Sequence, residues 1–151
     1  MSNLAESLSQ GGLTSQSSTW YRQLLEIETR VLGEEHLAIS RIKLNLAKSL
    51  INEGQHETGE QLVSDVLKLQ KRVWGDEHPD TLYTASTLAS TLDAQQRWKE
   101  AEIIHRQVCA TRKKVLGETH PKTLWSEVGS AKCLIWQGQY EQAESILRNV
   151  I

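Results

Sequence analysis

The sequence is poor in the residue types that mark several protein classes. Its 151 residues contain no phenylalanine, one methionine, two prolines and two cysteines. Cys109 and Cys133 are too few for a disulfide framework, so a reducing compartment is the expected setting. No apolar run is long enough to span a bilayer. The first residues lack the basic and apolar regions of a signal peptide, and we therefore expect a cytoplasmic protein.

The sequence also lacks a large excess of charge of either sign. The formal net charge is -2, far from the strongly basic balance of nucleic-acid-binding domains. Such a chain is also not drawn to an anionic membrane surface. The 38% of hydrophobic residues suffices for a packed core. The composition thus predicts a folded protein with neither a nucleic-acid nor a membrane partner.

The two prolines point to an internal repeat, because Pro79 and Pro121 are 42 residues apart. Segments that begin at Val31, Val73 and Val115 align at this spacing without gaps. Several positions keep one residue type in all three segments, among them Gly33, Gly75 and Gly117; His36, His78 and His120; Ala47, Ala89 and Ala131; Leu50, Leu92 and Leu134; Glu60, Glu102 and Glu144; Val66, Val108 and Val150.

Residues 3–12 parallel residues 45–54 and indicate a partial earlier copy. We therefore predict one domain over residues 1–151. Its parts would be a partial repeat at 1–30, repeats at 31–72 and 73–114, and a partial final repeat at 115–151.

Apolar and small residues within one repeat follow a helical spacing. From Pro79 they recur at Leu82, Ala85, Leu88, Ala89 and Leu92. Proline is well suited to a first helical turn. A turn at 95–97 and a second helix from near 98 to 116 are expected next, with a glycine cap at 117. No alternating pattern typical of strands competes, so the predicted fold is all-α.

Small residues are expected to set the distance between the two helices of a pair. Ala89 and Ala101 would let them approach closely, where a bulky side chain would force them apart. The first repeat has Gly59 in place of Ala101 and His56 in place of Trp98. We therefore expect the first repeat to be the least well packed.

The residues of this pattern resemble the tetratricopeptide repeat family. In the second repeat the resemblance is carried by Leu88, Ala89, Leu92, Trp98, Ala101 and Val108, and in the third by Ala131, Leu134, Gly138, Tyr140, Ala143, Leu147 and Val150. The LGxxHPxTL stretch at 116–124 resembles the kinesin-light-chain subgroup, which also occurs in C-terminal regions of nucleotide-binding receptor proteins. The resemblance implies a right-handed superhelical solenoid of antiparallel helix pairs. Its concave groove would bind a peptide or a partner segment.

The family register also implies which residues face that groove. They are Asn3, Arg41, Asn45, Lys48, Tyr83, Thr87, Trp125, Lys132 and Trp136, with Asp93, Val128 and Ile135 on the same faces. Trp125 and Trp136 are three helical turns apart and would flank an apolar patch with a charged centre. Alternatively, one or both tryptophans pack against a further repeat. Asn3 and Asn45 would contact a peptide backbone or remain solvated.

The histidines and cysteines could in principle carry chemistry. One histidine per repeat, about 10 Å apart, cannot share a metal ion with bonds of about 2 Å. We expect His36, His78 and His120 at helix starts or in interhelix hydrogen bonds. His105 and Cys109 are four residues apart, as a base and a nucleophile could be, but the family register makes both interhelix residues. No metal, cofactor or enzymatic activity is predicted, and Cys133 is expected to be a buried thiol.

The leading functional hypothesis is a protein-binding scaffold. One alternative is the repeat region of a larger signalling or receptor protein, which the partial first repeat favours. Another is a homo-oligomer formed through uncapped repeat ends.

Overall fold

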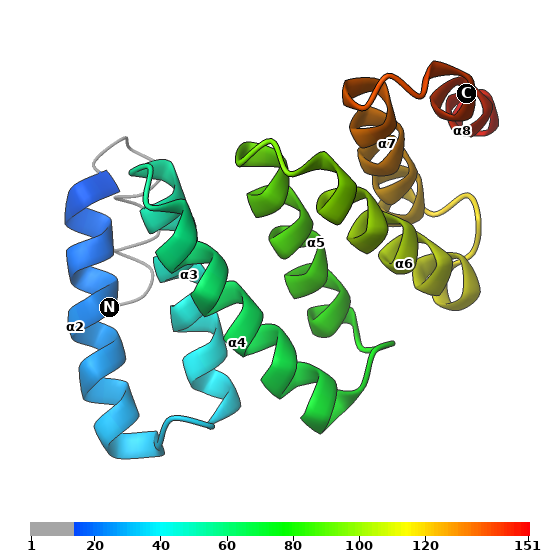
Figure 1. Cartoon of the computed structure of the whole chain (residues 1–151). Helices are drawn as coiled ribbons and strands as arrows, with labels where there is room; N and C mark the ends of the chain where they lie inside the picture. The colour runs from blue at the N-terminus through cyan, green and yellow to red at the C-terminus, as the bar shows by residue number, and fades with distance from the viewer. Residues whose placement is uncertain (1–13) are drawn as a thin grey trace. The chain divides into compact units, whose positions relative to one another are not determined.

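In this computed structural model, which describes residues 14–151, every regular element is an α-helix (Figure 1). The helices are α2 (Thr14–Leu32), α3 (Leu37–Asn52), α4 (His56–Trp74), α5 (Pro79–Ala94), α6 (Trp98–Leu116), α7 (Pro121–Trp136) and α8 (Tyr140–Val150). The predicted all-α fold is confirmed, and α5 and α6 have the bounds that the sequence predicted. None of the described helices is long and apolar enough to cross a membrane.

The chain divides into two compact units between residues 72 and 73, where one repeat passes into the next. In the first unit, α2 and α3 pack side by side, as the blue and cyan ribbons of Figure 1 show. Tyr21 and Leu24 of α2 are buried against Ile42, Leu46 and Leu50 of α3. This contact is one apolar cluster of the first unit, in which Val63 and Val66 of α4 are also buried.

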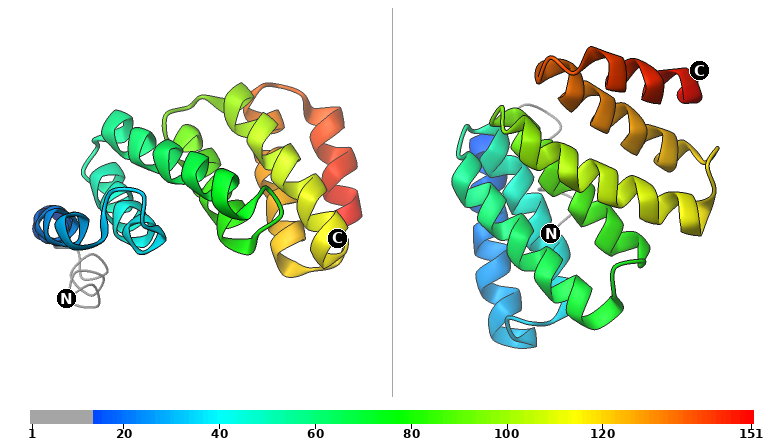
Figure 2. Two further views of the ribbon diagram at one scale, coloured as in Figure 1. Left: turned by 90° about the horizontal axis from the view of Figure 1, so that it is seen from below. Right: turned by 45° about the vertical axis from the view of Figure 1, so that its right-hand side comes forward.

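In the second unit each helix packs against the next, from α5 to α8. Figure 2 shows α7 between α6 and α8. One core cluster joins Leu92, Ala101 and Cys133 from three successive helices. A second, built around Leu134 and Ala143, joins α7 to α8. Helix α7 therefore buries one side in two interfaces.

Polar contacts also tie α6 to α7. The buried guanidinium of Arg112 donates through Nη1 to the Lys122 carbonyl at 3.1 Å and to the Ser126 hydroxyl at 2.7 Å. Lys113 pairs with the buried Glu127 carboxylate at 2.6 Å. This hydrogen bond raises the pKa of the Lys113 ammonium. These contacts give hydrogen-bonding partners to the charges of Arg112 and Glu127, which would be costly to bury without them.

The repeated histidines begin the first helix of each pair. His36, His78 and His120 are the N-caps of α3, α5 and α7. Each Nδ1 accepts a hydrogen bond from the backbone N–H two residues later, at 3.1, 3.2 and 3.1 Å. An N-cap of this kind satisfies a donor that the helix leaves unpaired. The predicted helix-start role is confirmed.

The turns that connect the two helices of each pair share the same hydrogen-bonded geometry. At the end of α5, the Gln96 N–H donates to the Asp93 carbonyl at 2.9 Å and the Arg97 N–H to the Leu92 carbonyl at 3.0 Å. The turns after α3 and α7 have the same two bonds and place glycine in the left-handed conformation. The middle turn has Gln96 there, at φ 60°. A side chain in this conformation costs about 1–2 kcal/mol.

Packing is close at Gly59, where the first repeat lacks the alanine of the others. A Cβ at this position would lie 2.5 Å from Ile51 Cγ1 and 3.0 Å from the Ala47 carbonyl oxygen. Ile51 thus fills the space that an alanine methyl would take. At this position the expected loose packing of the first repeat is wrong, because a neighbouring side chain compensates for the missing Cβ.

We predict that His120→Ala lowers the free energy of unfolding by about 0.5–2 kcal/mol, because α7 loses its side-chain cap. His120→Asn should retain most of the stability, since asparagine also accepts at an N-cap. Urea unfolding followed by circular dichroism measures both. Equal losses in the two variants would show that the cap does not stabilise the fold.

We predict that Gly59→Ala destabilises the parent chain by about 1 kcal/mol. Overpacking costs about 1–3 kcal/mol and outweighs the gain of about 1 kcal/mol from replacing a helical glycine. In an Ile51→Ala background the closest contact is gone and only the Ala47 carbonyl oxygen at 3.0 Å remains, so the same substitution should destabilise less. Urea unfolding of the four proteins in this double-mutant cycle gives the change in the free energy of unfolding in each background. The same effect in both backgrounds contradicts the close packing.

Candidate functional site

The exposed side of α7 is the most apolar surface among the predicted site residues. Trp125 is 76% exposed and Trp136 is 63% exposed. Val128 and Ile135 lie between them in sequence and are also exposed, as is Lys132. We call these five residues the α7 stripe. The interfaces with α6 and α8 take the other side of the helix, including Ala131 and Leu134.

One end of the α7 stripe is held by a neighbouring helix. The rings of Trp136 and Trp98 stack with centroids 5.4 Å apart and planes 10° from parallel. The Lys132 ammonium lies over the Trp98 ring, 5.9 Å from its centroid. Such a contact adds a favourable cation–π interaction. Trp136 therefore packs within its own unit and keeps most of its surface exposed.

The remaining predicted residues lie on α3 and α5. Tyr83 is exposed on α5 and Thr87 is partly buried one turn later. In the first unit Arg41 is exposed, while Asn45 and Lys48 are partly buried on α3. Arg41, Asn45, Lys48 and Tyr83 each already interact within the chain. Asn3 lies outside the described residues.

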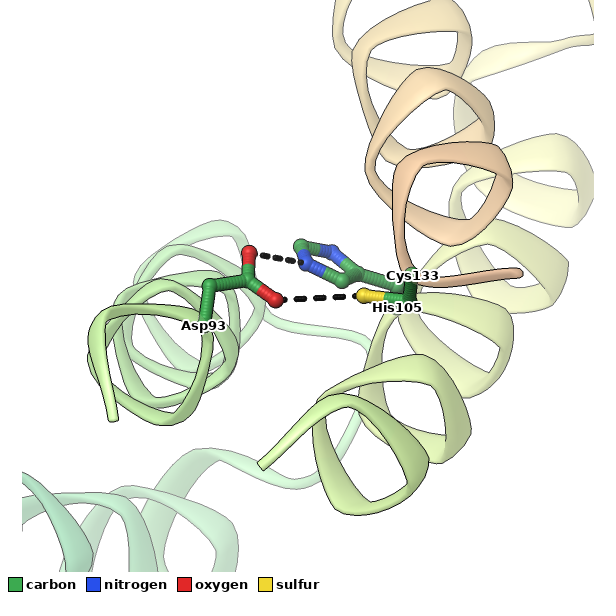
Figure 3. A group of neighbouring side chains, drawn as sticks. All are labelled: Asp93, His105 and Cys133. Carbon is green, nitrogen blue, oxygen red and sulfur yellow. Dashed lines mark hydrogen bonds and ion pairs between the residues drawn. The ribbon is translucent and has the colours of Figure 1, made fainter. Parts of the chain in front are cut away.

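Asp93 does not face outward as the family register implied. Its side chain is only 11% exposed and turns toward α6 and α7 (Figure 3). One carboxylate oxygen, Oδ2, lies 3.2 Å from His105 Nε2. The other, Oδ1, accepts a hydrogen bond from the Cys133 thiol at 3.1 Å. Three helices thus meet at one carboxylate, whereas the family register gave Asp93 only as a groove-face residue.

The electrostatics of this Asp93–His105–Cys133 cluster follow from burial and hydrogen bonding. Burial alone would raise the pKa of Asp93, but hydrogen bonds from His105 and Cys133 and the charges of His105 and Lys132 lower it. Burial raises the pKa of Cys133 to about 12, and the hydrogen bond to Asp93 and its charge act in the same direction. In the arrangement described, Cys133 is a thiol donor rather than a nucleophile.

The His105 and Cys109 pair is not arranged for nucleophilic catalysis. His105 directs Nε2 to Asp93. Burial raises the pKa of the Cys109 thiol, while Lys113 and Arg112 oppose this shift and Glu127 reinforces it. A catalytic thiol needs a lowered pKa. Cys109 is thus a buried core residue, and so is Cys133, as the sequence predicted.

The sequence did contain a pattern that marks the cluster. At the 42-residue spacing, Asp93 corresponds to Ile51 and Ile135, and His105 corresponds to Val63 and Leu147. Two polar residues therefore replace apolar ones at matching positions of a single repeat. Departures from the repeat, as well as positions that keep it, therefore mark Asp93 and His105 as unusual residues.

Comparison with known proteins identifies the family. Residues 38–114, just over half of the chain, match a family described as tetratricopeptide repeat, and residues 1–38 match a second family of the same description. No curated protein matches the chain.

Solved structures agree with this assignment. Two crystal structures of nearly identical TPR-like repeats, attributed to a kinesin light chain of Podosopora anserina, each have a TM-score of 0.90 and 27% sequence identity. They cover 99% of this chain, which spans 70% and 71% of theirs. BtubC (BKLC) from P. vanneervenii shares the fold at a TM-score of 0.88 and 19% identity, over 97% of this chain and 59% of its own. The chain therefore belongs to the tetratricopeptide repeat family and is of the kinesin-light-chain-like kind.

Proposed function

We propose that this chain is a protein-interaction scaffold, not a catalyst, and that a partner segment docks on the α7 stripe. Tetratricopeptide repeats are generally protein-interaction modules. The observation that supports the α7 stripe is the exposure of two tryptophans on one side of one helix. Tryptophan is enriched among the residues that dominate binding energy, and exposed apolar patches mark binding sites.

The chemistry of the α7 stripe suggests the kind of ligand. Trp125, Val128 and Ile135 offer apolar surface, and Lys132 adds a positive charge among them. An extended segment with apolar side chains on either side of an acidic residue would complement this arrangement. The acid would pair with Lys132 in a partly desolvated setting, which favours specificity over raw affinity.

The other predicted residues are further candidates for contact with a partner, each within its own unit. Tyr83 and Thr87 on α5 occupy the register of Trp125 and Gly129 on α7. In the first unit, Arg41 and Asn45 on α3 match Tyr83 and Thr87, and Lys48 matches Lys132. An asparagine amide both donates and accepts, so Asn45 is suited to a peptide backbone. Asn3 belongs to the same predicted set and lies outside the described residues.

Two other roles use the same surface differently. In a larger signalling or receptor protein, the α7 stripe would contact another segment of that protein. In a self-associating module, a second copy would cover it. A peptide ligand is favoured here because Lys132 places a charge in the middle of the α7 stripe, whereas the cores of obligate interfaces between copies are depleted of charge.

We predict that Trp125→Ala and Trp136→Ala each weaken binding of a partner peptide by about 30-fold or more, a hot-spot loss of about 2 kcal/mol. The peptide would be selected from a random display library against the parent chain. Tryptophan fluorescence and isothermal titration calorimetry measure its affinity.

Trp20→Ala is the matched control, because Trp20 is also an exposed tryptophan but lies on α2 in the first unit. It should leave the affinity unchanged. Parent-like affinity in both α7 variants, or an equal loss in the α2 variant, would rule out the α7 stripe as the docking surface.

Light scattering separates a peptide scaffold from a self-associating module. For a scaffold we expect the mass of one chain across the accessible concentration range. A mass that rises with concentration, and that Trp125→Ala returns to one chain, would instead assign the α7 stripe to contacts between copies.

A further inference from the structure

The Asp93–His105–Cys133 cluster brings together three kinds of metal ligand. Asp93 comes from α5, His105 from α6 and Cys133 from α7 (Figure 3). A carboxylate oxygen, an imidazole nitrogen and a sulfur all lie within 4.8 Å of one another. Carboxylate, imidazole and thiolate are the three ligand types that bind zinc in proteins. The cluster therefore has a donor set that fits a divalent transition-metal ion.

The fold itself does not require these polar groups. The matching positions of the other repeats hold Ile51 and Ile135 in place of Asp93, and Val63 and Leu147 in place of His105. Apolar side chains are thus compatible with the same helix pairing. Placing a carboxylate and an imidazole at sites that are only 11% and 10% exposed incurs a desolvation cost. A ligand shared by both groups would explain why one repeat departs from the apolar pattern.

Helix α7 accommodates the imidazole by omitting a side chain. A Cβ on Gly129 would lie 2.7 Å from two atoms of the His105 ring. The matching positions hold Asn45 and Thr87, so glycine is specific to this repeat. Glycine within a helix costs about 0.5–1 kcal/mol relative to alanine. Together with Asp93 and His105, this is a third departure from the repeat at one place.

We propose that Asp93, His105 and Cys133 bind one Zn²⁺-class divalent ion, with water in the fourth position. Asp93 Oδ2 lies 3.2 Å from His105 Nε2, Oδ1 lies 3.1 Å from Cys133 Sγ, and one ligand atom from each residue lies within 4.8 Å of the others. Bonds of about 2.0–2.3 Å to a tetrahedral ion place donor atoms about 3.3–3.8 Å apart. Small side-chain rotations would bring the three atoms around one centre.

Binding involves no change of oxidation state. The Cys133 sulfur loses its proton to solvent and coordinates as a thiolate. The His105 ring places its hydrogen on Nδ1 so that Nε2 can donate its lone pair to the ion. The carboxylate and the thiolate together balance the double positive charge. Lys132 and Glu102 are the other charged groups near Cys133.

Cobalt titration of the full chain tests the site directly. With Co²⁺ as the probe, we expect one equivalent to bind and to produce a thiolate-to-cobalt charge-transfer band. Cys133→Ser should abolish the band and weaken Zn²⁺ binding by more than about 100-fold, because even residues that only support a ligand contribute about 10–100-fold. Serine is tolerated in this register, since Ser49 occupies the matching position.

Cys109→Ser is the matched control. Cys109 is also a buried cysteine, but it lies outside the cluster. It should keep the cobalt band and the zinc affinity. Absence of the band in the parent chain, or loss of the band in the Cys109 variant with retention in the Cys133 variant, would overturn the proposal. The cluster would then be a hydrogen-bonded contact only.

A second variant separates metal binding from folding. Asp93→Ile combined with His105→Val gives the second repeat the residues of the first. We expect native circular dichroism and no bound zinc by equilibrium dialysis. Parent-like zinc binding in this variant would contradict the site. Should this variant fail to fold, His105→Gln together with the Cys133 variant decides the question, since both should lose zinc if the site is real.

Discussion

The short distance between paired helices is the constraint on which the other contacts depend. Positions at these contacts hold alanine and are fully or almost fully buried: Ala47, Ala89, Ala101, Ala131 and Ala143. A larger side chain at one of them would separate two helices and open the apolar contacts on either side. Where the chain replaces such an alanine, as at Gly59, a neighbouring side chain moves in. At Gly59 the missing methyl group is therefore replaced by side-chain atoms of Ile51.

This packing divides each helix into a buried side, which is constrained, and an outer side that is free to vary. Helix α7 uses Ala131 and Leu134 for its own core and presents Trp125 and Lys132 outward. The outer residues are less constrained by packing than the buried ones, so their identity can vary with the surface that they contact. The stacking of Trp136 on Trp98 then fixes one end of this surface. A partner would meet a partly preorganised ring, which lowers the entropy lost on binding.

Much of the fold was predictable from the sequence because it is encoded by local and repeated signals. The apolar spacing from Pro79, the turn at 95–97 and the histidines before each first helix predicted elements that the structure contains. The cluster around Asp93 was not predicted, because its members are 12 and 40 residues apart along the chain and meet only through helix packing. Pairwise contacts of this kind depend on the side of each helix that a neighbour covers. Family register alone did not indicate that Asp93 meets His105 and Cys133.

The left-handed Gln96 has a consequence for how the second unit is held together. Glycine takes this conformation freely in the matching turns, whereas Gln96 is strained there. Asp93, whose carbonyl accepts from the Gln96 N–H, also links α5 to α6 through His105. The side-chain link thus spans the same connection in which the backbone is strained. Local opening of this helix pair would relieve the strain at Gln96 but would have to break the contact between Asp93 and His105, so the cluster opposes opening at this turn.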